Sequence, residues 1–418
     1  MKDRQVWAID TEIYPNFFLI CGINVDTGDR RYFPIFEEDS FMPEFIHWFN
    51  TEVRGIVTYN GLGFDGPLIQ HVIITNGNTT PETLYKLAEA LISREGGYQE
   101  SVDKPHIDMM RLLHLDRFGI GLKAAAFWLR HDTIQDLPIP PGSTITADQI
   151  DDLVEYCFND CDITAKLFHK FKGSITLRKQ LLKTFDIDVL NKANAQIGEE
   201  LMLQLLSKGD AAKKKEIKNR RTFRNIIHIE DCIPDYIKFE TPELQRILDK
   251  CKTGTITPDK KAGIDEKFQF AGMEWVFGAG GLHCFAKPGE YSGNIIASDF
   301  SSYYPNLAVS LKIRPEHLGD EFSELYLQIY EERKKHKKGT PENTAYKLAL
   351  NGNFGKFASE YSYLYDPLAL YRITIAGQLT MAMHIEKLYL CGIETFIVNT
   401  DGYSVRLKPG QESLYQTL

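Results

Sequence analysis

Four carboxylates and one tyrosine in the first 160 residues have the types and spacings of a two-metal hydrolytic site. Asp10 and Glu12 are two residues apart in a strand-like stretch, so both side chains project from one face of the strand. Carboxylates held that close repel each other unless a divalent cation neutralises them. Asp65 follows a strand and a turn, and Tyr156 and Asp160, four residues apart, share one face of an expected helix. This set predicts phosphodiester hydrolysis with two Mg²⁺ or Mn²⁺ ions, one activating water and one stabilising the leaving oxygen.

A second pair of acids lies near the end of the sequence. Asp299 directly follows the apolar strand 295–298, and Asp401 lies in the expected tight turn of a strand pair, 395–398 and 403–407. Two aspartates at facing strand ends can hold two Mg²⁺ ions between a primer 3′-hydroxyl and a nucleoside triphosphate. The reaction would be in-line attack on the α-phosphorus with pyrophosphate leaving. Asp-Gly between apolar strands is also a common hairpin turn, so this cluster alone leaves a structural role open.

Residues 321–337 and 341–356 are predicted to form two charged helices of a helical hairpin, joined at residues 338–340. Lys347, Asn351 and Gly355 recur every four residues and line one helical face. A lysine-rich helical hairpin alone is more often a solvated surface. Because this one lies between the two aspartates in the sequence, we favour a phosphate-binding role for it.

The first 175 residues read as alternating strands (6–10, 17–25 and 55–59) and helices (81–95 and 147–172), which implies a mixed α/β layer fold. Residues 176–225 are expected to be mainly helical, and 226–267 irregular and polar. Strands are expected again at 274–277 and 294–298.

The length of 418 residues predicts about two to four domains, and 43% hydrophobic and 25% charged residues are typical of a globular chain. No apolar run reaches the roughly 20 residues that a membrane span needs, and no signal peptide is evident, so we expect no membrane association and a cytoplasmic location.

The seven cysteines are expected to be reduced thiols. A net charge of −9 argues mildly against nucleic acid, but phosphate contacts need only local basic clusters. Two such clusters exist: Lys213, Lys214, Lys215, Lys218, Arg220, Arg221 and Arg224, and Arg333, Lys334, Lys335, Lys337 and Lys338.

Six short clusters in this order resemble the three exonuclease and three polymerase motifs of family B DNA polymerases of the bacteriophage type. They are 10–12, 60–65, 156–160, 299–305, 347–355 and 399–402. The resemblance implies an RNase H-like 3′–5′ exonuclease domain of the DEDD-tyrosine type at 1–175 and a helical or irregular connecting region at 176–270. It implies a ferredoxin-like palm at 271–418, with helical fingers at about 318–356. The fold class is thus α/β and α+β, multidomain, and the substrates are primed DNA template and deoxynucleoside triphosphates.

The resemblance also implies roles for single residues. The metal ligands would be Asp10, Glu12, Asp65 and Asp160 in the exonuclease site, and Asp299 and Asp401 in the polymerase site, each site holding two Mg²⁺ (or Mn²⁺) ions. Tyr156 would orient the attacking water, and Asn60 and Phe64 would grip the primer 3′ end. Tyr304 would stack under the incoming sugar and exclude a ribose. Lys347 and Arg333 would meet the triphosphate, and Asn351 and Gly355 would face the nascent base pair.

The chain departs from the family pattern in a few places. Asn399 and Gly402 stand where relatives carry an aspartate and a serine, and Phe354 replaces a tyrosine. Only 17 residues follow Asp401, so the thumb is expected to be absent and a second polypeptide is a possible source of it. The N-terminal domain of larger relatives is expected to be missing. No insertion typical of protein-primed members fits between Asp299 and Lys347, so a nucleic-acid primer is expected.

A glycine-rich segment, Gly278–His283, resembles the template-contacting segment of phage-type members, although a simple glycine turn is an open alternative. Two other functions also stay open. One is a stand-alone 3′–5′ exonuclease with an inert polymerase half. The other is a non-catalytic DNA-binding subunit, against which the retention of every expected metal carboxylate speaks.

Overall fold

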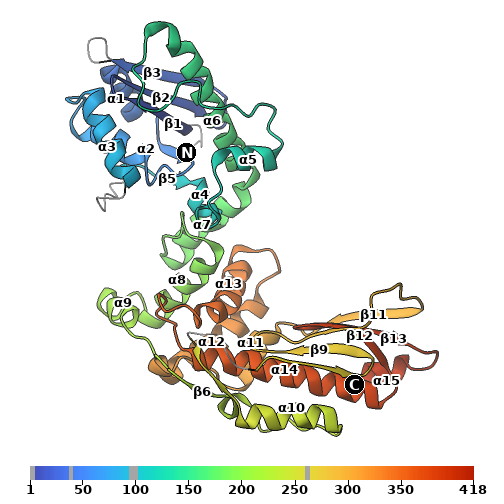
Figure 1. The fold of residues 1–418 in the computed structure, drawn as a ribbon. Helices are drawn as coiled ribbons and strands as arrows, with labels where there is room; N and C mark the ends of the chain where they lie inside the picture. Colours follow the sequence, from blue (N-terminus) through green and yellow to red (C-terminus); the bar gives the residue numbers. More distant parts are fainter. Residues whose placement is uncertain (1–4, 37–40, 94–101, 259–263) are drawn as a thin grey trace. The chain divides into compact units, whose positions relative to one another are not determined.

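The computed structural model describes residues 5–36, 41–93, 102–258 and 264–418, without the side chains of residues 116 and 117. By its internal contacts the chain divides into two compact units, Met1–Ala193 and Asn194–Leu418 (Figure 1). The predicted connecting region is divided between them, because residues 176–193 belong to the first unit and residues 194–270 to the second. The predicted boundaries at 175 and 270 stay predictions.

The first unit is built on a five-stranded sheet of order β3-β2-β1-β4-β5. The strands are β1 (Val6–Tyr14), β2 (Phe17–Asn24), β3 (Arg30–Phe36), β4 (Gly55–Thr58) and β5 (His106–Asp108). The pairs β1–β2 and β2–β3 are antiparallel, whereas β4 is parallel to both β1 and β5. Every residue of β2 is buried, so both faces of the sheet are covered.

Different helices cover the two faces of this sheet (Figure 1). Residues of β1 and β2 such as Ile9 and Phe18 pack with α1 (Met42–Thr51), α2 (Asp65–Ile74) and α3 (Pro81–Ser93). On the other face, Leu19 and Cys21 pack with α6 (Ile150–Lys170). Ala8 packs with the C-terminal part of α6. Asp10 and Glu12 follow it at every second position along β1, so they project from the same face and also face α6. The unit is completed by α4 (Met109–Leu112), α5 (Leu122–Leu129) and α7 (Lys172–Phe185).

The second unit contains a six-stranded antiparallel sheet of order β11-β13-β12-β10-β9-β8. The strands are β8 (Glu266–Phe270), β9 (Met273–Phe277), β10 (His283–Phe285), β11 (Asn294–Asp299), β12 (Glu394–Asn399) and β13 (Gly402–Leu407). One face packs on α14 (Pro367–Leu390) and α10 (Pro242–Thr253), in a core that contains Trp275, Phe277 and Val398. A short pair, β6 (Ile227–His228) and β7 (Thr255–Ile256), and α15 (Glu412–Thr417) flank this core.

The predicted helical hairpin is confirmed as α12 (Gly319–Lys335) and α13 (Pro341–Lys356). Thr340 caps α13 by accepting a hydrogen bond from the amide of Asn343, and Pro341 starts the helix. α13 packs on α8 (Asn194–Ser207), which is followed by α9 (Ala211–Lys218), and α11 (Tyr303–Ser310) contacts both hairpin helices.

The prediction that residues 226–267 are irregular is wrong for α10. Pro242 stands at the first turn of this helix, where proline is tolerated, so it begins the helix instead of breaking it. Leu244, Ile247, Leu248 and Cys251 form the buried stripe. The carboxylate of Glu386 accepts hydrogen bonds from the amides of residues 240 and 241 and so fixes where α10 starts.

The longest helix, α14, carries charged residues such as Arg372 and Lys387. Among the described residues, no helix combines the length and the apolar character that spanning a bilayer requires.

Candidate active sites

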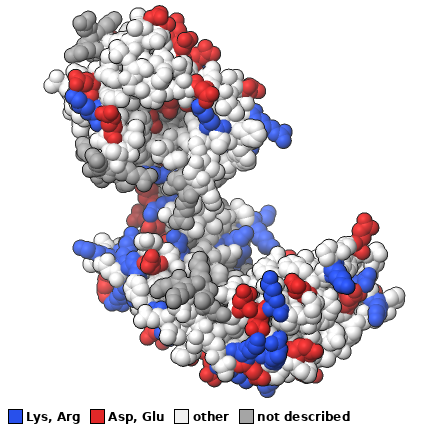
Figure 2. Space-filling view, viewed as in Figure 1, with Lys and Arg blue, Asp and Glu red and all other residues white. Residues whose placement is uncertain are grey.

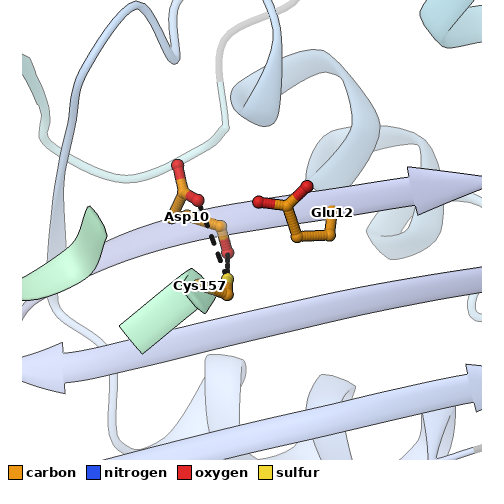
Figure 3. A group of neighbouring side chains, drawn as sticks. All are labelled: Asp10, Glu12 and Cys157. Atoms are coloured by element: carbon orange, nitrogen blue, oxygen red, sulfur yellow. Dashed lines mark hydrogen bonds between the residues drawn. The ribbon is translucent and has the colours of Figure 1, made fainter. Parts of the chain in front are cut away.

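The first site is a group of carboxylates between β1 and α6. Asp10 and Glu12 project from the same face of β1, and Cys157 of α6 lies against them (Figure 3). Ligand atoms of these three residues lie within 4.8 Å of one another. The Cys157 thiol donates to the Asp10 backbone carbonyl at 3.5 Å and to the Asp10 carboxylate at 3.7 Å.

Burial and mutual repulsion make this group costly to ionise. Burial, then the charges of Asp65, Glu12 and Asp160, raise the pKa of Asp10 well above its usual value. Burial, followed by the charges of Asp160 and Asp65, raises the pKa of Glu12 to about 8. Burial likewise raises the pKa of Asp65 to about 7 and that of Asp160 to about 6. The four acids therefore lie close enough to interact, as the sequence spacing predicts.

Tyr156 and Asp160 lie one turn apart on α6, where the tyrosine hydroxyl is near enough to lower the pKa of the Asp160 carboxyl against the larger effect of burial. Burial and the neighbouring acids, Asp160 foremost, raise the pKa of Tyr156 above its usual value. The hydroxyl therefore stays protonated near neutral pH and acts as a hydrogen-bond donor toward the acids.

Asp65 is held at the first turn of α2 by Thr11, whose hydroxyl donates to the Asp65 carboxylate at 2.6 Å. The preceding turn starts at Asn60, in the left-handed region with φ of 67°, and ends at Phe64. The buried carboxylate of Asp108 fixes this turn by accepting hydrogen bonds from the amides of Asn60 at 3.0 Å and Leu62 at 3.1 Å.

Three residues of this site escaped the sequence analysis: Thr11, Asp108 and Lys123. The charge of Lys123 lowers the pKa of Asp160, against the larger effect of burial. An acid at the end of a short buried strand, as Asp108 is in β5, was the available signal for one of them.

This set of donors fits a hard divalent cation. The carboxylates are buried together, raise one another's pKa and offer only oxygen atoms, which Mg²⁺ and Mn²⁺ prefer. Cys157 fits less well, because burial raises the pKa of its thiol and so keeps it protonated. All seven cysteines are free thiols, as predicted.

The second site lies where β11 and β13 meet the β12–β13 turn. Asp299 is paired with Gly402 across the β11–β13 ladder, and the amide of Phe300 donates to the Asp401 carbonyl at 2.8 Å. The two aspartates thus come together at adjacent strand ends, as the sequence predicts. A Cβ on residue 402 would lie 2.3 Å from the Asp299 carboxylate, so that carboxylate occupies the space that a side chain at 402 would need.

A cavity of about 400 Å³ opens beside Asp401. It is lined by five of the predicted residues, Tyr304, Arg333, Lys347, Asn351 and Asp401, together with Ser301, Ser302, Tyr303, Pro305, Leu350, Phe354 and Thr400. Oxygen ligands from Asp401 beside two cationic side chains are a donor set that fits a metal-bound triphosphate.

Contacts on the cavity wall orient several of these side chains. The Tyr304 ring packs on Phe354 with centroids 4.8 Å apart, and burial raises the pKa of Tyr304 to about 12. A guanidinium nitrogen of Arg333 lies 3.4 Å from the hydroxyl of Ser302, the left-handed residue that starts α11. Asp299 and Gly355 do not line the cavity.

The glycine-rich segment packs against the turn that carries Asp401. The amide of Thr400 donates to the Leu282 carbonyl at 2.8 Å, and a Cβ at Gly281 would lie 2.4 Å from the Thr400 hydroxyl. Gly281 is therefore needed for packing, whatever else the segment does. Gly352, similarly, backs onto Ala195 of α8, and its Cβ would lie 3.4 Å from the Ala195 carbonyl.

Comparisons with known proteins bear on this arrangement. No protein-family model matches the sequence, and no curated protein does. Among solved structures, the family B DNA polymerase from the hyperthermophilic archaeon Pyrobaculum calidifontis matches over 99% of this chain, with a TM-score of 0.52. The fold is similar to that of the matched part of this family B DNA polymerase. The sequence identity is 16%, and the chain spans 55% of the archaeal polymerase, about half its length. The predicted mixed, multidomain fold is confirmed at this level.

The two basic clusters differ in how their charges are used. In the first, Lys213 pairs with Glu321, Arg221 donates to the carbonyls of residues 360 and 361, and Arg224 pairs with the buried Asp366. Lys and Arg side chains gather over α9 on the face shown in Figure 2. In the second cluster Lys334 and Lys335 pair with neighbouring glutamates, whereas Arg333 lines the cavity.

Proposed function

We propose that this chain is the catalytic part of a bacteriophage-type family B DNA polymerase with a 3′–5′ proofreading exonuclease. It would act in DNA replication, in the host cytoplasm. The observation that carries the proposal is the cavity beside Asp401, which brings together five residues that the sequence resemblance marks for nucleotide transfer. The first unit would be the RNase H-like exonuclease. The second would hold a ferredoxin-like palm, with α12 and α13 as the fingers.

For nucleotide addition, the residues of the cavity and the neighbouring Asp299 have separate roles. Lys347 and Arg333 neutralise the triphosphate, and Asp299 and Asp401 would hold two Mg²⁺ or Mn²⁺ ions. Such ions stabilise the charge that develops on the attacking and leaving oxygens. Tyr304, whose ring packs on Phe354, would lie under the incoming sugar and exclude a ribose 2′-hydroxyl by its bulk.

For nucleotide removal, Asp10, Glu12, Asp65 and Asp160 would hold the ions, which make water nucleophilic and stabilise the leaving oxygen. The Tyr156 hydroxyl is a protonated donor beside Asp160, so it is suited to orient the attacking water. Asn60 and Phe64 sit on the turn fixed by Asp108 and would grip the primer 3′ end.

We also propose that a strand from a further segment or from a second polypeptide pairs with the open edge of the sheet in the second unit. The support is β11, the strand that ends in Asp299. Among the described residues it pairs only with β13, and Ile295 on it is 40% exposed. A free strand edge with exposed apolar side chains is suited to pair with another strand.

A stand-alone exonuclease is the second candidate function. One observation favours it: the Asp299 carboxylate lies over Gly402 and does not line the cavity with Asp401. The retained carboxylates argue against a non-catalytic DNA-binding subunit.

Primer extension and degradation on a labelled primer–template test the proposal. We expect Asp401→Ala to abolish extension and spare degradation of the primer, and Asp10→Ala to do the reverse. If the wild-type chain degrades single strands but adds no nucleotide, even at low salt, the stand-alone exonuclease is the better description. If either substitution removes both activities in a folded protein, the two-site assignment is wrong.

A further inference from the structure

A cavity of about 290 Å³ lies along α7 in the first unit, and we call it the α7 groove. One wall is a single face of α7, whose lining residues recur with the helical period. They are Lys172, Ile175, Thr176, Lys179, Gln180 and Lys183. The facing wall comes from the first strand, the turn after β2 and the end of α6. It consists of Val6, Val25, Asp26 and Phe168.

The bottom of the α7 groove is part of the core of the first unit. Val25, Phe168 and Ile175 are buried and belong to one hydrophobic cluster. On the opposite side of α7, the buried Arg178 donates a hydrogen bond to the Lys192 carbonyl at 2.8 Å. α7 is therefore anchored from both sides, and the groove is preformed. A rigid groove loses little conformational entropy when a ligand binds.

The lysines of the groove carry charge that the described part of the chain does not neutralise. Lys172, Lys179 and Lys183 form no ion pair with any described residue. Asp26, on the facing wall, is the one acid among the described lining residues. Three cations beside one acid attract an anion, and an anionic partner also relieves the repulsion among the lysines. The ligand is therefore negatively charged.

The spacing of the lysines indicates the shape of this ligand. Lys172 and Lys183 are eleven residues apart, which is about 16 Å along the helix axis. A single phosphate or carboxylate reaches at most Lys179 and Lys183, which are one turn apart. A ligand that meets all three lysines is therefore extended and carries several anionic groups. The apolar bottom of the groove requires an apolar group on the same ligand, because a fully polar one would leave that surface unused.

These features favour a peptide over nucleic acid. Single-stranded nucleic acid binds where bases stack on exposed rings, and the one aromatic ring among the described lining residues, Phe168, is only 7% exposed. An acidic amphipathic helix, by contrast, presents carboxylates every three or four residues beside a stripe of apolar side chains. Its period, charge and polarity all complement the lysine face of α7.

We propose that the α7 groove is a docking site for an acidic amphipathic helix of a partner protein. Carboxylates of that helix pair with the three lysines, and one of its apolar side chains enters the cavity over Ile175 and Phe168. The inference does not depend on either proposed reaction. Phe168 lies eight residues beyond Asp160 on α6, about 12 Å along the helix, so the docked segment lies apart from the exonuclease carboxylates.

Binding of designed peptides to the full chain, followed by fluorescence anisotropy, tests the groove. The probe is a fluorescein-labelled helical peptide of about twelve residues, the length of the lysine face, with glutamates and leucines on adjacent stripes. A second peptide has the same composition in scrambled order. We expect the wild-type chain to bind the patterned peptide about tenfold more tightly than the scrambled one. Lys179→Glu should weaken that binding about tenfold, because it replaces an attraction with a repulsion.

Thr176→Trp tests the cavity separately, because Thr176 is an exposed lining residue and the larger ring fills the space without changing the charge. It should weaken binding of the patterned peptide while the melting temperature of the chain stays unchanged. Lys86→Glu is the matched control, since Lys86 is an exposed lysine on α3 of the same unit, and it should leave the affinity unchanged.

Two results would overturn the proposal. The first is equal binding of the patterned and scrambled peptides, or normal binding by Thr176→Trp, because the attraction would then be general and not made by the groove. The second is displacement of the peptide by an oligothymidylate whose own affinity falls in Lys179→Glu. That result would assign the lysine face to nucleic-acid phosphates instead of a protein partner.

Discussion

Neutralising one acid of the exonuclease group should stabilise the metal-free first unit while removing its metal site. Glu12→Gln is the sharpest such change, because glutamine has nearly the same shape. Burial and the charges of Asp160 and Asp65 raise the pKa of Glu12 from 4.5 to about 8. The unfolded chain therefore releases this proton near pH 4.5 and the folded unit near pH 8. Between these values the folded state holds a proton that the unfolded state lacks, so stability falls as pH rises through this window.

The size of the effect follows from the same values. The difference between about 8 and 4.5 sets an upper limit of about 5 kcal/mol, at 1.36 kcal/mol per pH unit. Because Asp160 and Asp65 can take up protons in its place, we expect Glu12→Gln to raise the free energy of unfolding by only about 2 kcal/mol at pH 8.5. For a unit of this size that corresponds to a rise of about 4–8 °C in melting temperature. At pH 5 the difference should be small.

Thermal melting in EDTA at pH 5 and pH 8.5, followed by the same melts with Mn²⁺, measures both parts of this prediction. Mn²⁺ should raise the melting temperature of the wild-type chain at pH 8.5 and have little effect on Glu12→Gln. Glu82→Gln is the control, since Glu82 is an exposed acid on α3 that pairs with Lys86, and it should bring no such rise. If Glu12→Gln melts at or below the wild-type temperature in EDTA at pH 8.5, the crowding argument is refuted.

Two further substitutions probe the parts that position the sites. Gly402→Ala places a Cβ 2.3 Å from the Asp299 carboxylate and should displace it, lowering primer extension ten- to hundredfold with degradation intact. Gly289→Ala, whose Cβ would meet nothing closer than 4.0 Å, is the control and should be neutral in the same extension assay. Asp108→Ala removes the buried carboxylate that accepts from the amides of Asn60 and Leu62 and should cost about 2–4 kcal/mol in denaturant unfolding, with slower single-strand degradation. Asp108→Asn keeps one acceptor oxygen and should cost less. If the wild-type and Asp108→Ala chains are equally stable, Asp108 does not support the Asn60 turn.

The sequence predicted those parts of the fold and sites that depend on local pattern. Strand pleating placed Asp10 and Glu12 on one face, helical spacing placed Tyr156 beside Asp160, and the strand pair around Asp401 formed as expected. The helical hairpin was recognisable from its two charged segments. Its residues Lys347 and Arg333 line one cavity, which is consistent with the roles that the motifs imply for them.

What escaped prediction depends on contacts between distant segments. Asp108 supports the Asn60 turn from 48 positions away, and no local pattern reveals that link. Gly402 could be noted as a departure, but its reason, the Asp299 carboxylate above it, appears only once β11 and β13 are paired. α10 was missed because the polar segment 226–267 was predicted to be irregular, although a proline such as Pro242 is favoured at the first turn of a helix.

The central claim is that each unit holds divalent cations between crowded carboxylates, and Mn²⁺-soaked crystals test it most directly through anomalous scattering. We expect strong peaks within coordination distance, about 2.0–2.4 Å, of Asp10 and Glu12 in the first unit, and of Asp299 and Asp401 in the second. Binding at Asp299 also requires its carboxylate to leave the space above Gly402. Absence of a peak in either unit at saturating Mn²⁺ would contradict the claim for that unit.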